Sequence, residues 1–507
     1  MADTKREIER KFEFRGAKAG KRGVPDLTGT AGIAAVLDQG TADLDAVYYD
    51  TPDQRLAADG LTLRRRTGGQ DAGWHLKLPV APGVRDEVHA ALSDTVPRAL
   101  EALVRSRTRE QDLRPQVRLL SSRRLSHLVD ADGTLLAELS TDEVTAQRED
   151  TSVSWTEVEV ELADGIDEDL LDAVEKKFRK AGLKVSDAPS KLARALAETG
   201  AAPAPRPVPD VPAGSAADHV LAYLREQRDA LVAQDPAVRR NLPDSVHQMR
   251  VATRRLRSAF KTYRKVLDRE VTDPVGEELR WVAAELGVDR DQEVLLERLQ
   301  SHLGELPRTH VIGPARSRLR TWNTTRRSGS RRRALAVLDS ERYVALLDRL
   351  DALLADPPLL PAAGDPATTV LPKAVLRDYG RLADRVDHAR ALDPGHDRDL
   401  ALHDARKAAK RARYAVEAAV PALGKPAKKL AKAMKSVQTL LGDHQDSVVA
   451  REALLGLARQ AHGAGEPSFT WGLLLGREEA LADQRERELP QVWAEASDPG
   501  LRSALSP

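Results

Sequence analysis

The chain has 507 residues, enough for two or three domains, and no cysteine, which excludes disulfides, thiolate metal sites and cysteine nucleophiles. Residues 1–200 carry 30 Lys and Arg against 36 Asp and Glu, whereas residues 201–507 carry 49 against 42. The charged N-terminus argues against a signal peptide, and no apolar run approaches the ~20 residues of a membrane helix. We therefore expect a soluble cytoplasmic protein without a membrane partner.

The first two hundred residues contain short segments in which charged and apolar side chains alternate. In REIERKFEF, residues 6–14, Glu7, Glu9 and Lys11 occupy every second position, so on a β-strand they share one face. Similar alternation occurs in LTLRRRT (61–67), WHLKLP (74–79), VRDEVHA (84–90) and WTEVEVEL (155–162). We predict a mainly antiparallel β domain with a few helices, one of them near residues 168–181.

The charged faces of these strands carry both signs, with Arg64 and Arg66 on one strand and Glu157 and Glu159 on another. A single charged face is usually a solvated face, because antiparallel sheets often expose one side. If the strands close into a barrel, however, one alternating face becomes the interior, where unpaired charges are costly. A polyphosphate with Mg²⁺ or Mn²⁺ would neutralise such an interior, because cations hold phosphate oxygens and carboxylates hold hard metal ions.

An ordered set of motifs then gives a resemblance to a known family. The set consists of Glu7-x-Glu9-x-Lys11, Arg64-x-Arg66, Trp74-x-Leu76-Lys77, Arg85-x-Glu87, Ser121-x-Arg123, Asp142, Glu157-x-Glu159 and Ser190-Lys191. It resembles the CYTH family, the triphosphate tunnel metalloenzymes, over residues 1–200. The resemblance implies a closed tunnel of eight antiparallel β-strands, with flanking helices, that binds triphosphate compounds.

The resemblance also implies roles for individual residues. Phosphates would be held by Arg64, Arg66, Lys77, Arg123 and Lys191, with Glu87 shaping the tunnel. The metal ion, Mg²⁺ or Mn²⁺, would be held by Glu7, Glu9, Asp142, Glu157 and Glu159. Lys11 and Glu9 would act at the reacting end, where water attacks a phosphoanhydride without a side-chain nucleophile.

Two assignments stay open at the level of the sequence. Glu161 continues the acidic face, so the metal pair is either Glu157 and Glu159 or Glu159 and Glu161. Arg123 and Arg124 are adjacent and point opposite ways on a strand, and the Ser-x-Arg spacing favours Arg123 as the interior residue.

Residues 201–215, AAPAPRPVPDVPAGS, predict an extended linker because their prolines forbid regular structure. Beyond the linker the sequence has helical periodicity broken by Pro and Gly, which predicts an all-α domain over residues 216–500. The whole chain is therefore expected to be an α+β multidomain protein.

The helical half repeats itself, because VHQMRVATRRLRS (246–258) matches LHDARKAAKRARY (402–414). At helical spacing each copy places cations along one side, and these two stripes consist of His247, Arg250, Arg254, Arg257 and Lys261, and of His403, Arg406, Lys410 and Arg413. A solvated face is the simpler interpretation. Like charges at i,i+4 are destabilising without an anion, however, and their recurrence in both copies favours anion binding.

A second echo follows each copy, LGVDRD (286–291) and LLGDHQD (440–446). The pairs Asp289/Asp291 and Asp443/Asp446 are predicted to cap helices or to pair with stripe arginines rather than to bind metal. Two further basic segments, residues 320–333 and 425–435, would either extend the cationic track or form ordinary basic surface.

The duplicated His-x-x-Arg motifs resemble the CHAD domain, which often follows CYTH. That resemblance implies two pseudo-symmetric four-helix bundles with a basic surface that binds inorganic polyphosphate. The combined expectation is metal-dependent hydrolysis of inorganic tripolyphosphate, or of a related triphosphate, with polyphosphate bound by the helical domain. The alternatives are a non-catalytic polyphosphate-binding or targeting protein, an RNA 5′-triphosphatase and an adenylyl cyclase. Only 18 aromatic residues are present, which argues against nucleic acid as a partner.

Overall fold

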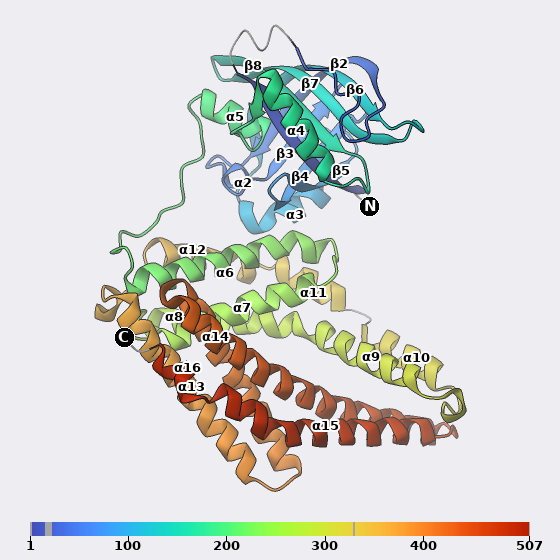
Figure 1. Cartoon of the computed structure of the whole chain (residues 1–507), viewed down its shortest axis with the longest axis vertical. Coiled ribbons are helices and arrows are strands. Elements are labelled where there is room, and N and C mark those ends of the chain that lie inside the picture. The colour runs from blue at the N-terminus through green and yellow to red at the C-terminus, as the bar shows by residue number, and fades with distance from the viewer. Residues whose placement is uncertain (1–2, 16–22, 328–329, 506–507) are drawn as a thin grey trace. The chain divides into compact units, whose positions relative to one another are not determined.

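The computed structural model describes residues 3–15, 23–327 and 330–505, without the side chains at 3, 288–291, 325–327 and 330. The chain divides into two compact units, Met1–Arg206 and Pro207–Pro507, which we describe separately (Figure 1). The division falls inside the predicted linker, of which residues 201–212 form neither helix nor strand. Among the described residues, no helix combines the length and apolar character needed to cross a membrane.

The first unit is built around one antiparallel sheet. Its strands are β1 (Asp3–Phe14), β2 (Ala35–Asp50), β3 (Thr62–Thr67), β4 (Gly73–Ala81), β5 (Val84–Ala90), β6 (Arg114–Val129), β7 (Leu135–Arg148), β8 (Thr151–Leu162) and β9 (Leu183–Val185). They pair in the order β5-β4-β3-β2-β6-β7-β8-β1-β9, and β1 pairs again with β5. Eight strands therefore close into a ring, with β9 added beyond it, which confirms the predicted tunnel.

Strand β1 closes the ring because its two halves pair with different neighbours. Its first half, Asp3–Ile8, is opposite Val84–His89 of β5, whereas Glu9–Phe12 is opposite Val158–Glu161 of β8. A strand that completes a sheet in this way leaves the ring without the free edges that promote aggregation.

The apolar faces of the strands point outward and are covered by helices. Phe12 of β1 and Val158 of β8 pack beneath α4 (Asp169–Ala181), where the Phe12 and Phe178 rings meet edge to face at 4.8 Å. Elsewhere α2 (Arg55–Ala58) and α3 (Arg98–Thr108) cover Leu63 and Trp74, and α5 (Lys191–Glu198) covers β6–β8. Because side chains alternate along each strand, this outer apolar layer leaves the charged faces for the interior.

The second unit is all-helical, as predicted. Its elements are α6 (Ala216–Arg239), α7 (Ser245–Thr262), α8 (Arg269–Glu285), α9 (Gly287–Glu305), η1 (Arg308–His310), α10 (Ala315–Arg327), α11 (Ser330–Leu338), α12 (Glu341–Ala355), η2 (Pro361–Ala363), α13 (Ala367–Ala391), α14 (His396–Gly463), α15 (Phe469–Ala496) and α16 (Pro499–Ser503). Helix α14 is interrupted at Gly424, whose φ of 64° and ψ of −136° lie outside the helical region. Two helical segments therefore meet at a kink there.

The two repeated motifs lie on helices that contact each other. The first motif is on α7, which packs against α6, and the second is on α14, which packs against α13; α7 and α14 also touch. The Tyr263 hydroxyl donates to the Ala415 carbonyl at 2.8 Å, and Arg411 donates to the Lys261 carbonyl at 2.9 Å. The repeats therefore pack directly on one another, while their division into two four-helix bundles stays a prediction.

Candidate functional site

The interior of the strand ring is a cavity of about 330 Å³ to which all eight ring strands contribute polar side chains. Its lining consists of Lys5, Glu7, Glu9, Lys11, Tyr48, Thr62, Arg64, Arg66, Asp71, His75, Lys77, Arg85, Glu87, His89, Arg123, Glu138, Glu159, Glu161, Ser190 and Lys191. The alternating charged faces predicted from the sequence thus converge on one space.

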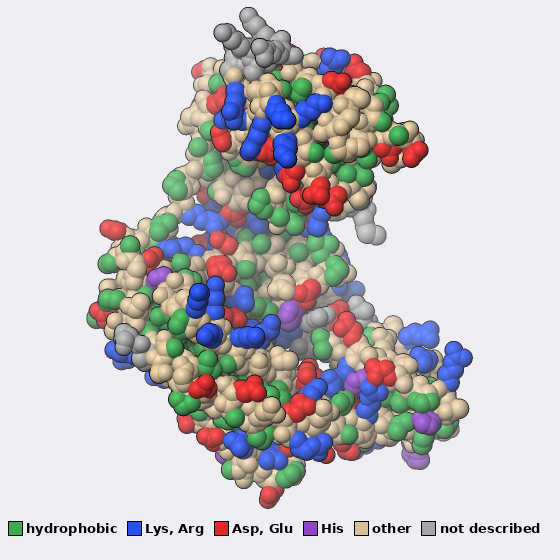
Figure 2. All heavy atoms as spheres, viewed as in Figure 1, with side chains coloured by type: hydrophobic (Ala, Val, Ile, Leu, Met, Phe, Trp, Pro, Cys, Tyr) green, Lys and Arg blue, Asp and Glu red, His purple; other side chains and the backbone are tan. Residues whose placement is uncertain are grey.

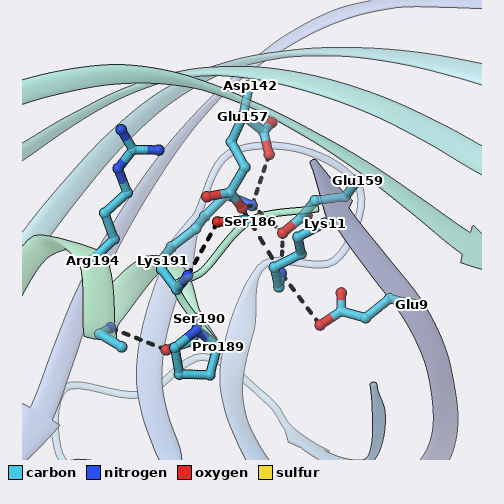
Figure 3. A network of polar contacts seen from close by, with 12 residues as sticks. Glu9, Lys11, Asp142, Glu157, Glu159, Ser186, Pro189, Ser190, Lys191 and Arg194 are labelled. Carbon is cyan, nitrogen blue, oxygen red and sulfur yellow. Dashed lines mark hydrogen bonds and ion pairs between the residues drawn. The ribbon is translucent and has the colours of Figure 1, made fainter. Parts of the chain in front are cut away.

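Strand register brings the carboxylates of β1 and β8 together. Lys11 is opposite Glu159 and Glu9 is opposite Glu161. The Lys11 Nζ lies 3.2 Å from Glu9 Oε1 and donates a hydrogen bond to Glu159 Oε1 (Figure 3). Burial alone would lower the pKa of Lys11, but Glu159 and Glu9 outweigh it and raise that pKa. Two carboxylates therefore already converge on one cationic group at this point.

Lys191 enters the tunnel from the start of α5 because Ser190 caps that helix, its hydroxyl accepting from the Ala193 amide at 3.0 Å. The Lys191 Nζ lies 2.9 Å from Asp142 Oδ2, 3.0 Å from Glu157 Oε1 and 2.5 Å from Glu159 Oε1. The three carboxylates raise the pKa of Lys191 although burial opposes them.

Two of the predicted metal ligands lie behind the cavity lining. Asp142 and Glu157 are 0 % and 1 % exposed, whereas Glu159 and Glu161 face the cavity. Asp142 accepts two hydrogen bonds from Arg123, each 2.7 Å long. In this arrangement Asp142 and Glu157 hold cationic side chains of the protein itself.

The opposite part of the ring is rich in cations. Burial and repulsion by Arg64 and Arg123 lower the pKa of Arg66 to about 9. These cations also have carboxylate partners. Arg66 donates to Asp71, Lys77 donates to Glu7 at 2.6 Å, and Glu87 Oε1 lies 3.7 Å from the Arg64 guanidinium. The repulsion that remains among Arg64, Arg66 and Arg123 would be relieved by an added anion.

A histidine beside Glu87 was not among the predicted ligands. Its Nδ1 lies 2.9 Å from Glu87 Oε1 and its Nε2 lies 2.9 Å from the Asp71 carbonyl. Burial, which outweighs Glu87, lowers the pKa of His75 to about 4. Both ring nitrogens face acceptor oxygens, and a neutral imidazole, which has one N–H, can donate to only one of them.

The structure separates Arg123 from its neighbour as the spacing suggested. Arg123 lines the cavity, whereas Arg124 points outward and pairs with Asp38 at 2.8 Å. Seven lining residues belong to none of the motifs named from the sequence, namely Lys5, Tyr48, Thr62, Asp71, His75, His89 and Glu138. His89 and Glu138 lie two and four positions from Glu87 and Asp142, so the same alternation points to them.

In the helical unit the two cationic stripes approach each other. The stripe residues are half-buried except for Lys261, which is exposed. Lys410 of the second stripe has its pKa lowered to about 7 by burial and by repulsion from Arg406, Arg254 and Arg250. Arg254 and Arg250 belong to the first stripe, so arginines of both repeats lower the pKa of Lys410.

In the second sequence echo one aspartate pairs with a stripe arginine, whereas the other pairs with an arginine of α15. Asp446 lies 3.6 Å from Arg406, and Asp443 lies 3.4 Å from Arg485. Both aspartates are inside α14, so they pair with arginines and cap no helix. The side chains of Asp289 and Asp291 lie outside the described residues.

Further cations are present on the surface of this unit. Figure 2 shows Lys and Arg side chains gathered in groups on its visible face. In the basic segment 425–435 the five lysines, Lys425, Lys428, Lys429, Lys432 and Lys435, are all exposed. The segment 320–333 is described only in part.

Comparison with known proteins agrees with both resemblances. Residues 5–196 match the CYTH domain model, and residues 222–455 match the CHAD domain model. The chain belongs to the CYTH–CHAD proteins. Uncharacterised proteins from two strains of Mycobacterium tuberculosis are 39 % identical to it over 516 residues, covering 98 % of this chain and 97 % of theirs.

Two solved structures are similar to this CYTH–CHAD protein. One is PptA from Streptomyces chartreusis, with a TM-score of 0.47 and 24 % identity, covering 55 % of this chain and 99 % of that one. The other is the CHAD domain from the plant Ricinus communis, with a TM-score of 0.44 and 26 % identity, covering 58 % of this chain and 95 % of that one. CYTH domains are metal-dependent and include triphosphatases and cyclases, so the first unit is a triphosphate-tunnel domain.

Proposed function

We propose that the CYTH domain hydrolyses inorganic tripolyphosphate, or a closely related triphosphate, with Mg²⁺ or Mn²⁺, and that the CHAD domain binds polyphosphate. The observation that carries the proposal is the convergence of cations and carboxylates on the interior of one closed ring. Cations line it from β1, β3, β4, β5, β6 and α5, and most of the carboxylates come from β1, β5, β7 and β8. A metal–triphosphate complex has the complementary charges.

The residues present fit a hard divalent metal. The donors that face the cavity are carboxylate oxygens, the ligands that Mg²⁺ and Mn²⁺ prefer. Glu7, Glu9, Glu159 and Glu161 would hold the ion. Asp142 and Glu157 would join them once Lys191 and Arg123 turn to phosphates. The bound ion would neutralise charge on the phosphate oxygens.

Phosphate binding and the stabilisation of developing charge would depend on the protein's own side chains. Arg64, Arg66 and Arg123 would bind phosphate oxygens and stabilise the charge that develops when the phosphoanhydride breaks. Lys11, held between Glu9 and Glu159, would stand at the end of the triphosphate nearest the carboxylates. Water is the nucleophile in this scheme.

The CHAD domain would bind the long polyphosphate chain along both stripes. Support comes from the repulsion at Lys410, which a bound anion relieves. Displacement of labelled polyphosphate by RNA at fixed salt tests the choice of ligand, because non-specific phosphate binding falls steeply with salt. Equal displacement by RNA would contradict a polyphosphate site.

Phosphate release from tripolyphosphate, with and without Mg²⁺, tests the enzyme. We expect metal-dependent release that falls on the order of 100-fold in Glu9→Gln, because a ligating carboxylate is lost. Glu143→Gln is the matched control, since Glu143 is exposed on the outer face of β7. Binding of tripolyphosphate without release by the wild type would contradict catalysis and leave a non-catalytic binding protein.

A further inference from the structure

A second group of metal-ligating side chains lies away from the tunnel and the stripes, where α14 and α15 pack together. His444, on the later segment of α14, faces Asp399 from the start of that helix and Glu486 from α15. The His444 side chain is 2 % exposed, and those of Asp399 and Glu486 are each 16 % exposed. One ligand atom from each residue lies within 4.8 Å of the other two.

Each carboxylate in this group is oriented by an arginine. Arg451 donates to Asp399 Oδ2 at 2.8 Å, and Arg398 donates to Glu486 Oε2 at 2.9 Å. The other oxygen of each carboxylate, Asp399 Oδ1 and Glu486 Oε1, is turned toward His444 Nε2. Outer partners of this kind fix ligating carboxylates in metal sites.

The contact between His444 Nε2 and Glu486 Oε1 has hydrogen-bond geometry, so the case for a metal is the convergence of three ligand atoms on one point. His444 Nε2 lies 3.4 Å from Asp399 Oδ1 and 3.2 Å from Glu486 Oε1. Charge-assisted hydrogen bonds are shorter, about 2.7–2.9 Å, and one nitrogen has a single proton to share between two oxygens. A tetrahedral zinc ion with bonds of about 2.0–2.1 Å separates its ligand atoms by about 3.3–3.4 Å.

We propose that Asp399, His444 and Glu486 bind a divalent transition metal, Zn²⁺, through His444 Nε2 and the inner oxygen of each carboxylate. The partial exposure of the two carboxylates lets water complete the coordination. The imidazole distinguishes this site from the carboxylate set proposed for Mg²⁺ in the tunnel, because nitrogen donors favour Zn²⁺. A metal here would tie both segments of α14 to α15, and this role is independent of the proposed function.

The test uses the full-length protein after chelator treatment, titrated with Zn²⁺ in equilibrium dialysis and with Co²⁺ as a spectroscopic probe. The wild type is expected to bind one more equivalent of Zn²⁺ than His444→Gln or Glu486→Gln. It should also show the visible absorption of four-coordinate Co²⁺, which both variants lose. His462→Gln, at an exposed position of α14, and Glu9→Gln, in the tunnel, should both keep that absorption.

A second measurement covers the case in which His444→Gln does not fold. Zn²⁺ should raise the melting temperature of the helical unit in Glu9→Gln but not in Glu9→Gln/Glu486→Gln, with circular dichroism confirming that both chains are folded. Equal Zn²⁺ stoichiometry and equal melting shifts with and without Glu486 would overturn the proposal. The three residues would then be a hydrogen-bonded set only.

Discussion

Lys410 shows how one residue can make anion binding depend on pH. The pKa of its ammonium is lowered to about 7, first by burial and then by Arg406, Arg254 and Arg250, whereas Asp446 raises it. A bound phosphate favours the charged form, so binding at pH 8 takes up a proton. Without ligand the folded chain binds fewer protons than the unfolded chain between pH 7 and 10.5, so this residue makes stability rise with pH there.

We therefore predict that polyphosphate affinity falls on the order of 10-fold between pH 7 and pH 9 at constant ionic strength. Lys410→Arg should remove most of this slope, because a guanidinium stays charged throughout the range. Isothermal titration calorimetry in buffers of different ionisation enthalpy would also detect the proton uptake. An identical slope in Lys410→Arg would assign the pH dependence to another group.

At the scale of elements, a glycine at the start of α9 sets how closely that helix approaches the first stripe. Arg250 donates to the Gly287 carbonyl at 3.4 Å, and a Cβ at Gly287 would lie 2.8 Å from Arg250 Nη2. Gly442 is the matching residue of the second repeat. A Cβ there would lie 3.7 Å from the Arg406 guanidinium, which is ordinary contact.

Gly287→Ala should therefore displace the Arg250 guanidinium and weaken polyphosphate binding several-fold, about 1 kcal/mol. Gly442→Ala is the matched control and should leave the affinity unchanged, with helix stability unchanged or higher by about 0.5–1 kcal/mol. Fluorescence titration with labelled polyphosphate and thermal melts would separate these effects. Equal losses of affinity in both variants would show that Arg250 is not positioned by Gly287.

Strand alternation is a local property, and it could therefore predict which charged side chains of most strands face the interior of the ring. Glu7, Glu9 and Lys11 share the interior face because the side-chain period of a strand is two. Asp71 follows β3 outside any alternating run, and Tyr48 is uncharged, so neither carries a local signal.

Contacts between distant segments could not be read from the sequence. The capture of Asp142 and Glu157 by Lys191 depends on where α5 packs on the ring. The meeting of Asp399, His444 and Glu486 depends on the interruption of α14 at Gly424 and on the packing of α15. That the two stripes face each other could be expected only because the duplication implied two similar helical bundles facing each other.

At the scale of the whole molecule, the two proposed anion sites lie on one chain, in domains joined by a proline-rich linker. A polyphosphate bound by the CHAD domain would raise the local concentration of chain ends for the tunnel, since tethering makes the second encounter intramolecular. Tripolyphosphate has only three phosphates, so we expect that binding at the CHAD stripes does not assist its binding in the tunnel. The CHAD stripes should therefore matter for long substrates and not for short ones.

The last prediction uses Arg254→Gln/Arg257→Gln, which removes two charges from the first stripe. For long-chain polyphosphate we expect kcat/KM to fall on the order of 10-fold at fixed salt, because charged contacts in the captured complex are lost. Hydrolysis of tripolyphosphate should be unchanged. Lys373→Gln/Arg487→Gln, which removes two exposed cations from α13 and α15, is the matched control and should affect neither substrate. Unchanged hydrolysis of the long chain in the stripe variant would show that the two domains act separately.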